Sequence, residues 1–498
     1  MTRALLLSVF VIATCGLVYE LLAGTIASYL LGDSVTQFST IIGTYLFSMG
    51  VGSWLAKFVR QRLIAQFIQI EILVGFLGGI SAAVFFVTFA EIAAFRVVLY
   101  AWVVMIGIGV GMEIPLLLRI LKDQLQFSDL VSKVLSIDYL GALVASLLFP
   151  LWLVPQVGLV RASFLFGILN VGVALWACRL FRAQIGPNGI LPIQAAAVLV
   201  VLCGGFAASD AITDHAEGGL YSDEVIYAKT TSYQRIVLTR GKQDLRLHLN
   251  GHLQFSSFDE YRYHEALVHP GLASVARPDR VLVLGGGDGL AVREILRDPR
   301  VKSVTLVDLD PGMTTLFRDH AELSRLNDGA LRDPRVAVVN DDAFLWIDRP
   351  GEPFDFVVVD FPDPSNFSVG KLYTTAFYRR LRARLAPGGI AVVQSTSPLF
   401  ARQAFWCVDA TLQSAGFVTA PYHAYVPSFG EWGFVIAGEA PFRVPDAFPP
   451  GLKFLNATVA RSLFEFPDDM KRVAVEPNRL NNQMLVHYYD EEWRKLQD

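Results

Sequence analysis

Long apolar runs fill the first two hundred residues of this chain and limit its fold more than any other feature. A helix that crosses a bilayer needs about 20 mostly apolar residues. Charged residues make up only 18% of the 498-residue chain, whereas soluble proteins carry roughly 25%. Ordinary globular patterning follows the runs, so we expect an α-helical membrane bundle of about seven spans followed by a soluble region. The predicted spans are Ala4–Leu31, Thr36–Phe58, Ile64–Phe89, Ile92–Leu121, Val134–Val154, Val160–Phe181 and Ile190–Ala208.

The first span is not a secretory signal peptide, because Glu20 interrupts it and further spans follow. Acids also lie in other spans, and Arg96 lies in the fourth. Ionisable groups are costly in a bilayer and usually face a bundle interior or a cavity. They could form a cation path or a polyamine-binding vestibule; alternatively, Arg96 neutralises one acid and the others reach water near helix ends. The acids are Glu20, Glu71, Glu113 and Asp138.

The chain divides into five predicted parts. After the membrane domain at 1–208 comes a polar, acidic linker at 209–220. Alternating apolar residues and the Asn250-Gly251 turn predict a small antiparallel β-domain at 221–256. Regular alternation of strands and helices predicts a doubly wound, Rossmann-like α/β domain at 257–440, and a mixed appendage follows at 441–498. The predicted strands are Arg280–Leu284, Ser303–Asp308, Arg335–Val339, Phe354–Asp360 and Ile390–Ser395, and the predicted helices include Leu372–Leu385 and Pro398–Ser414.

Charge and cysteine content argue against several classes of function and site. The net charge is −4 and no basic tract is present, which argues against nucleic-acid binding. The spacing of the four cysteines indicates neither a disulfide framework nor a zinc site, and we expect no metal.

Two stretches predict the location of the chemistry. The run 281–289 is an apolar strand that breaks into Gly285-Gly286-Gly287-Asp288-Gly289, and the run 357–364 is a later strand that ends in Asp360 and Asp363. Ligands of open α/β sheets bind at the carboxyl ends of the strands, so both runs should open onto one crevice.

Asp288 indicates which kind of ligand the glycine turn could bind. An acid directly after three glycines would repel a pyrophosphate or the carboxylate of S-adenosylmethionine and would suit a ligand with a free ammonium group. Alternatively, Asp288 caps the following helix.

Further acids are expected at the same edge of the sheet. Asp308 ends the second strand, where an acid commonly binds ribose hydroxyls. Asp341 and Asp342 follow the third strand and would bond an adenine amine or form a turn. Asp360 and Asp363 could grip a diamine, one of them accepting its proton. Such a crevice, without arginine, lysine or a metal-ligand cluster, favours cationic ligands.

The soluble half resembles the spermidine synthases, the polyamine aminopropyltransferases, in the bacterial form that is fused to a multi-spanning membrane region. Each motif is weak alone, but their order over 221–437 matches the family. The matching motifs are Tyr233-Gln234, 249–254 (Leu-Asn-Gly-His-Leu-Gln), Asp259-Glu260, Tyr263-His264-Glu265, 285–289, Asp308-Leu309-Asp310, Asp341-Asp342 and 360–364 (Asp-Phe-Pro-Asp-Pro).

The resemblance implies transfer of an aminopropyl group from decarboxylated S-adenosylmethionine, a co-substrate, to putrescine or a related diamine. The products are spermidine and 5'-methylthioadenosine, and no cofactor is needed. Asp360 would be the catalytic proton acceptor. The implied polyamine-binding residues are Tyr263, His264, Asp288 and Asp363, and the nucleoside-binding residues are Gln234, Gln254, Gly285, Gly287, Asp308, Asp341 and Asp342. We also expect a homodimer.

The motifs depart from the family at three places. Asn250 replaces an aspartate in a tight turn, 365–368 replaces a Gly-Pro pair, and 426–430 lacks a tyrosine, so acceptor preference could differ. Two other functions stay open: a polyamine transporter or sensor whose synthase-like domain is not catalytic, and a methyltransferase, which Asp288 disfavours.

The charges of the loops and the supply of substrates predict different sides of the membrane for the soluble region. Lysines and arginines at 57–62, 119–133 and 179–182 favour a cytoplasmic position for these loops in the cell membrane. With seven spans, the segment after Ala208 would then lie outside. Either the last span is not a full crossing or the domain lies outside; substrate supply favours the cytoplasm.

Overall fold

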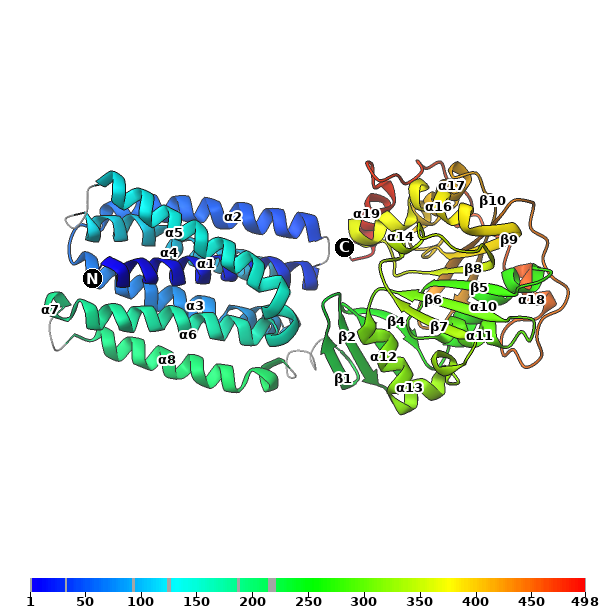
Figure 1. The fold of residues 1–498 in the computed structure, drawn as a ribbon, viewed down its shortest axis with the longest axis horizontal. Helices are drawn as coiled ribbons and strands as arrows, with labels where there is room; N and C mark the ends of the chain where they lie inside the picture. The colour runs from blue at the N-terminus through cyan, green and yellow to red at the C-terminus, as the bar shows by residue number, and fades with distance from the viewer. Residues whose placement is uncertain are drawn as a thin grey trace. The chain divides into compact units, whose positions relative to one another are not determined.

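The chain forms two compact units, Met1–Val225 and Ile226–Asp498 (Figure 1). This computed structural model describes residues 2–31, 34–91, 95–122, 127–185, 189–213 and 221–497. Of the predicted linker, residues 209–213 are helical, and 214–220 lie outside the described residues.

The first unit is a bundle of long helices around an apolar core. α1 packs against α2, α5 and α6, while α3 packs against α4 and α6. A π-helical segment, η2, directly continues α5. The elements are α1 (Thr2–Leu31), α2 (Ser34–Leu55), η1 (Ala56–Phe58), α3 (Leu63–Glu91), α4 (Phe95–Leu121), α5 (Phe127–Leu148), η2 (Phe149–Val157), α6 (Leu159–Leu180), α7 (Arg182–Ile185) and α8 (Leu191–Ala207).

Five of these helices are long and apolar enough to cross a membrane, which indicates a multi-pass membrane protein. The predicted helical membrane bundle is confirmed, with five or six apolar helices where the sequence predicts about seven spans. A helix lies at each predicted position, but α2 is not apolar enough over 18 residues, and α8 is an apolar helix of 17 residues. The polar residues of α2, such as Gln37 and Thr44, lower its mean hydropathy without interrupting the helix. The five helices cover Leu6–Leu31, Leu63–Phe89, Phe95–Leu121, Asp129–Val157 and Leu159–Leu180.

The acids of the spans are mostly inside the bundle. Glu71 and Glu113 are 0% and 2% exposed, and Glu20 is 8% exposed. Arg96 is exposed in the first turn of α4 and forms no ion pair with these acids in the described part of the chain. Neutralisation of a span acid by Arg96 is therefore not what the structure shows.

The second unit begins with a four-stranded sheet in the order β1-β2-β3-β4. Asn250 and Gly251 have φ angles of 51° and 83°, so they form the tight hairpin turn that the sequence predicts between β3 and β4. The strands are β1 (Glu224–Thr230), β2 (Arg235–Arg240), β3 (Leu245–Leu249) and β4 (His252–Ser256).

A seven-stranded sheet of order β10-β11-β9-β8-β5-β6-β7 forms the centre of this unit. The ladders from β9 to β7 are parallel, and β10 and β11 add an antiparallel edge. The predicted alternation is therefore confirmed, except that β9 begins earlier than expected, directly after α16. The strands are β5 (Arg280–Gly285), β6 (Ser303–Asp308), β7 (Val336–Asn340), β8 (Phe354–Asp360), β9 (Leu385–Gln394), β10 (Val418–Val426) and β11 (Gly430–Gly438).

Helices cover both faces of the large sheet (Figure 1). Along β5, Val281 and Val283 join one apolar core, and Leu282 and Leu284 join the other, as expected for a strand buried on both faces. The covering elements are α10 (Glu260–Ser274), α11 (Leu290–Leu296), α12 (Pro311–Asp319), α13 (Ala321–Leu326), η3 (Ala330–Arg332), α14 (Ala343–Trp346), α15 (Phe367–Gly370), η4 (Lys371–Tyr373), α16 (Thr375–Arg384) and α17 (Arg402–Ser414).

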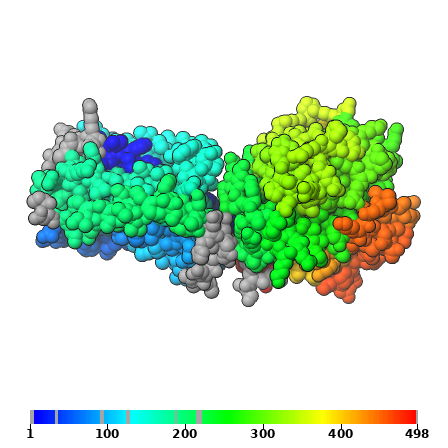
Figure 2. Space-filling view, turned by 90° about the horizontal axis from the view of Figure 1, so that it is seen from below, coloured from blue at the N-terminus to red at the C-terminus, as the bar shows by residue number. Residues whose placement is uncertain are grey.

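The C-terminal segment is part of this fold. The carboxylate of Glu265 accepts hydrogen bonds from the backbone N–H groups of 453–455, and Leu455 is buried in one core. Figure 2 shows this segment in orange on the surface of the second unit. Its helices are α18 (Ala457–Ser462) and α19 (Met484–Gln497), and α19 packs against α17.

Candidate active site

The glycine turn after β5 approaches the end of β8 closely. Gly285 pairs with Asp360 in the sheet register, and Gly285 and Gly286 have φ angles of 81° and 65°. Side chains other than glycine rarely adopt such angles. A Cβ atom on Gly287 would lie 2.7 Å from the carboxylate of Asp308, so the turn needs glycine for contact as well as for conformation.

Asp360 is bonded to a tyrosine from another element. The hydroxyl of Tyr263, on α10, donates to Asp360 Oδ1 over 2.6 Å. Within the described residues, Oδ2 has no hydrogen-bond donor, so this oxygen is available to a ligand. Burial raises the pKa of Asp360 to about 6, the charge of Asp288 adds to the increase, and the Tyr263 bond opposes it.

His264 lies on α10 next to Tyr263, and its imidazole contacts a buried ion pair formed by Glu260 and Arg293. Its Nδ1 is 2.8 Å from Glu260 Oε2, and Arg293 donates to both oxygens of Glu260 over 2.9 Å. Burial would lower the pKa of His264, but the hydrogen bond and charge of Glu260 outweigh burial and raise it. The charges of Asp288 and Asp360 also act on His264, which places the three side chains in one cluster.

Asp288 forms a hydrogen bond at the start of the following helix and also belongs to the acidic cluster. Its Oδ1 accepts from the backbone N–H of Leu290, the first residue of α11, over 2.9 Å, while Gly289 occupies the N-cap position. Its charge also acts on Asp360 and Asp308. Burial raises the pKa of Asp288, which is part of the same acidic cluster.

Asp308 is oriented by backbone N–H groups at the end of β6. Gly287 donates to its Oδ2 over 3.0 Å, and Asp310 donates to its Oδ1 over 2.9 Å. Burial raises its pKa to about 6. Gln234 bonds the neighbouring Asp310 rather than Asp308, with Nε2 2.9 Å from Oδ2.

Three further predicted site residues have partners of their own. Asp342 caps α14 through the Phe344 N–H and pairs with Lys371 Nζ at 2.6 Å, and Asp341 forms an ion pair with Arg349. The expectation that the crevice lacks lysine and arginine is thus wrong at this rim, because α14 and η4 bring both cations to these acids. Gln254 bonds only carbonyls of its own strand in the described part of the chain.

Asp363 is bound by residues that the sequence did not single out. Gln394 Nε2 donates to Asp363 Oδ1 over 3.2 Å, Thr396 Oγ1 to Oδ2 over 3.3 Å, and Tyr489 of α19 to Oδ2 over 3.1 Å. Gln394 ends β9, so the rule that ligands bind at carboxyl ends of strands could have identified it. Tyr489 has no such sequence signal.

Asp363 belongs to the cluster of Asp360. Both charges act on the Tyr263 hydroxyl, and burial raises the pKa of Asp363 to about 6. The structure therefore brings together most of the predicted polyamine and catalytic residues at the carboxyl ends of β5 and β8.

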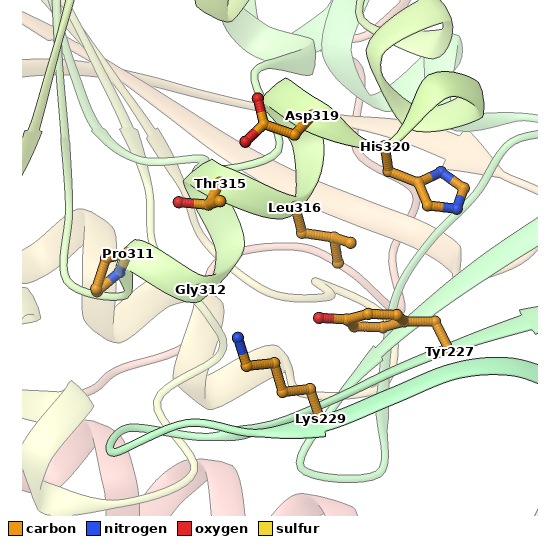
Figure 3. Close-up of a pocket in the computed structure, with 8 residues that line it drawn as sticks. All are labelled: Tyr227, Lys229, Pro311, Gly312, Thr315, Leu316, Asp319 and His320. Atoms are coloured by element: carbon orange, nitrogen blue, oxygen red, sulfur yellow. The ribbon is translucent and has the colours of Figure 1, made fainter.

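A cavity of about 490 Å³ lies between β1 and α12 (Figure 3). It is lined by Tyr227, Lys229, Leu316 and His320, among others, and none of the clustered acids contributes to it. None of the site residues that the sequence predicts lines this cavity, so we take the acid cluster as the candidate site. No group of three or more His, Cys, Asp or Glu side chains in the described ranges could hold a metal ion.

Comparison with known proteins identifies the family. The model of the spermine/spermidine synthase domain matches residues 260–443. A polyamine aminopropyltransferase of Leptospira interrogans is 57% identical over 498 residues and covers 100% of both chains. This chain belongs to the polyamine aminopropyltransferase family.

Other polyamine aminopropyltransferases match with similar coverage. Polyamine aminopropyltransferase 2 of Ralstonia nicotianae is 57% identical over 98% of both chains, and the Mycobacterium tuberculosis H37Rv relative is 38% identical over 99% of this chain and 97% of its own. A crystal structure of a spermidine synthase with the transition state analogue AdoDATO covers 49% of this chain and 86% of its own, at a TM-score of 0.46 and 24% identity.

The matches to whole aminopropyltransferases include the helical unit, so this unit is common to these relatives. The protein is thus an aminopropyltransferase with membrane helices. This result favours aminopropyl transfer over the two alternatives, methyl transfer and a non-catalytic transporter or sensor.

Proposed function

We propose that this aminopropyltransferase moves the aminopropyl group of decarboxylated S-adenosylmethionine to putrescine, giving spermidine and 5'-methylthioadenosine. The observation that carries the proposal is the cluster of Asp288, Asp360 and Asp363, whose charges suit a sulfonium nucleoside and a diamine.

In the proposed reaction, the amine nitrogen attacks the aminopropyl carbon that is bonded to sulfur. The new C–N bond forms as the C–S bond breaks, and the bonding electrons leave with sulfur as a neutral thioether. The nitrogen becomes positively charged and loses a proton to Asp360. Since the leaving group needs no proton, the protein's contribution is alignment and removal of a proton from the amine.

Each cluster residue has a proposed role. Tyr263 fixes one oxygen of Asp360, and the other oxygen faces the amine. Asp363 would hold the second ammonium of the diamine, and Asp288 with His264 would contact the amine of the aminopropyl group. This division is supported by the separate hydrogen-bond partners of Asp360 and Asp363.

Most of the proposed nucleoside contacts lie at the ends of β5 to β7, and Gln234 and Gln254 come from the small antiparallel sheet and its loop. Two backbone N–H groups fix the carboxylate of Asp308 at the end of β6, and we propose that it binds the ribose hydroxyls. Gly285 and Gly287 would let the nucleoside approach the backbone. The remaining proposed contacts are Gln234, Gln254, Asp341 and Asp342.

For the membrane side we propose the cytoplasm, where the substrates are supplied. One observation opposes this: Arg161, at the start of α6, forms an ion pair with Asp210, just after α8. The end of α8 therefore lies beside the start of α6, and the loop at 179–182, rich in arginine, lies at the opposite end of these two helices. Protease digestion of this unit in sealed, right-side-out vesicles would contradict the cytoplasmic proposal.

Methylthioadenosine release from the solubilised protein, with a panel of diamines, tests the activity. We expect the highest kcat/KM with putrescine. Asp360→Asn should lower kcat by several orders of magnitude with little change in nucleoside binding, because the proton acceptor is removed. Asp446→Asn, an exposed carboxyl of the same unit, is the matched control. Near-normal turnover of Asp360→Asn would remove Asp360 from this role.

The proposed homodimer is tested separately. Light scattering of the purified protein should give twice the chain mass after subtraction of detergent. A monomer mass at concentrations that support full activity would refute it.

A further inference from the structure

The helical unit contains buried oxygen atoms without hydrogen-bond partners, and the proposed reaction does not use them. Glu71 and Asn170 are 0% exposed, Tyr19 is 1% exposed and Glu113 is 2% exposed. One oxygen on each side chain has no partner in the described part of the chain: Glu71 Oε1, Glu113 Oε1, Asn170 Oδ1 and Tyr19 Oη. Buried polar atoms of this kind are rare, and a bound water or ion is one of the explanations for them.

Helix packing places Glu71 and Glu113 at the same level of the bundle. Val74 of α3 packs directly against Gly109 of α4. Only three residues separate these helices, so they run in opposite directions. One turn before Val74 therefore lies opposite one turn after Gly109, which are the positions of Glu71 and Glu113.

Asn170 and Tyr19 complete the group from two other helices. Asn170 Nδ2, on α6, donates to Glu71 Oε2 over 3.1 Å and to the Glu71 carbonyl over 2.9 Å, so its free Oδ1 lies beside the carboxyl group. The ring of Tyr19, on α1, packs against Gly78 of α3, and Tyr19 is close enough to Glu71 and Glu113 for their charges to act on it.

The charges of this group are not balanced by protein cations. Neither Glu71 nor Glu113 forms an ion pair with lysine, arginine or histidine in the described ranges. A buried carboxylate without a partner costs several kcal/mol, so a ligand or a proton must neutralise the pair. The nearby titratable groups are themselves neutral or acidic: Cys15 on α1, Tyr45 on α2 and Asp138 on α5.

We propose that Glu71, Glu113, Asn170 and Tyr19 bind one small monovalent inorganic cation such as Na⁺. Hard cations prefer oxygen ligands, and four free protein oxygens are fewer than the roughly six that Mg²⁺ takes or the six to eight of Ca²⁺. One monovalent cation together with one proton shared by the carboxyl groups neutralises both acids. This site is independent of the diamine and the nucleoside of the catalytic unit.

Radioactive sodium binding to the purified full-length protein tests the proposal, with choline chloride replacing NaCl at constant ionic strength and pH. We expect saturable binding of one Na⁺ per chain and a higher midpoint of thermal unfolding in NaCl than in choline chloride. Glu71→Gln and Glu113→Gln should each weaken Na⁺ binding by about tenfold or more, since a charged ligand is lost. Glu20→Gln, which removes a buried carboxyl that has no ligand role here, should bind as the wild type does.

Tyr19→Phe provides a milder variant, because it removes only the free hydroxyl and keeps the ring on Gly78. It should fold, retain aminopropyltransferase activity and still bind Na⁺ more weakly than wild type. Absence of saturable Na⁺ binding by the wild-type protein would overturn the proposal, and the oxygens would then be satisfied by protons and water. Wild-type affinity in both glutamine variants would overturn it as well.

Discussion

The bond between Tyr263 and Asp360 predicts a specific change in the pH dependence of catalysis. Tyr263 donates to Asp360 Oδ1 over 2.6 Å, and Tyr263→Phe removes this bond with little change in shape. A hydrogen bond to a charged group contributes about 1.5 to 3 kcal/mol, and one pKa unit corresponds to about 1.36 kcal/mol. The pKa of Asp360, about 6 with the bond present, should therefore rise by roughly one to two units without it.

The direction in which the pH profile moves follows from the role of Asp360 as proton acceptor. The acceptor must be ionised, so activity is present above its pKa and is lost as pH falls through that value. The acidic limb of kcat/KM against pH, measured by methylthioadenosine release, should move to higher pH in Tyr263→Phe. At high pH, kcat/KM should recover.

Tyr489→Phe is the matched control for this experiment. It removes a hydrogen bond of similar kind from Asp363 and leaves that of Asp360 intact. Its acidic limb should stay in place even if the KM for the diamine increases. An acidic limb that does not move in Tyr263→Phe would refute the assignment of Asp360 as the group that must ionise.

Three further outcomes are expected. Gly287→Ala should weaken binding of the nucleoside co-substrate by about 1 to 3 kcal/mol in calorimetry, because the added Cβ would lie 2.7 Å from Asp308; unchanged affinity would place the nucleoside elsewhere. Glu260→Gln should lower the free energy of unfolding by about 3 kcal/mol, since Arg293 loses one of its two buried carboxylate partners, whereas the exposed control Asp446→Asn should change it by less than about 1 kcal/mol. Without ligands, the catalytic unit should lose thermal stability as pH rises from about 4 to about 6, because folding raises the pKa of three site aspartates and the folded state then binds more protons; stability that increases over this range would contradict the raised values.

The order of the elements in the catalytic unit could be predicted from local sequence. Buried parallel strands are short apolar runs, and Gly285 to Gly289 and Asn250-Gly251 mark turns that few other residues allow. The grouping of Asp288 with Asp360 also followed, because neighbouring parallel strands end at the same edge.

The number of membrane helices could not be predicted from the sequence as reliably as the order of elements in the catalytic unit. A hydropathy pattern shows where a helix is apolar, but α2 combines a span's length with many polar side chains. The pattern also could not show that Glu71 and Glu113 are at the same level. That depends on the packing of Val74 on Gly109, a contact between two helices.

By itself, the sequence determined the two unlike halves, the strand and helix order, and the acids at the strand ends, because these depend on residues that are neighbours along the chain. Only the tertiary structure decided which side chains hold those acids. Tyr263 reaches Asp360 and Tyr489 reaches Asp363 across separations of 97 and 126 residues. A hydrogen bond needs its two atoms within a few tenths of an ångström of one distance, and only the packed fold sets distances between residues so far apart in the chain.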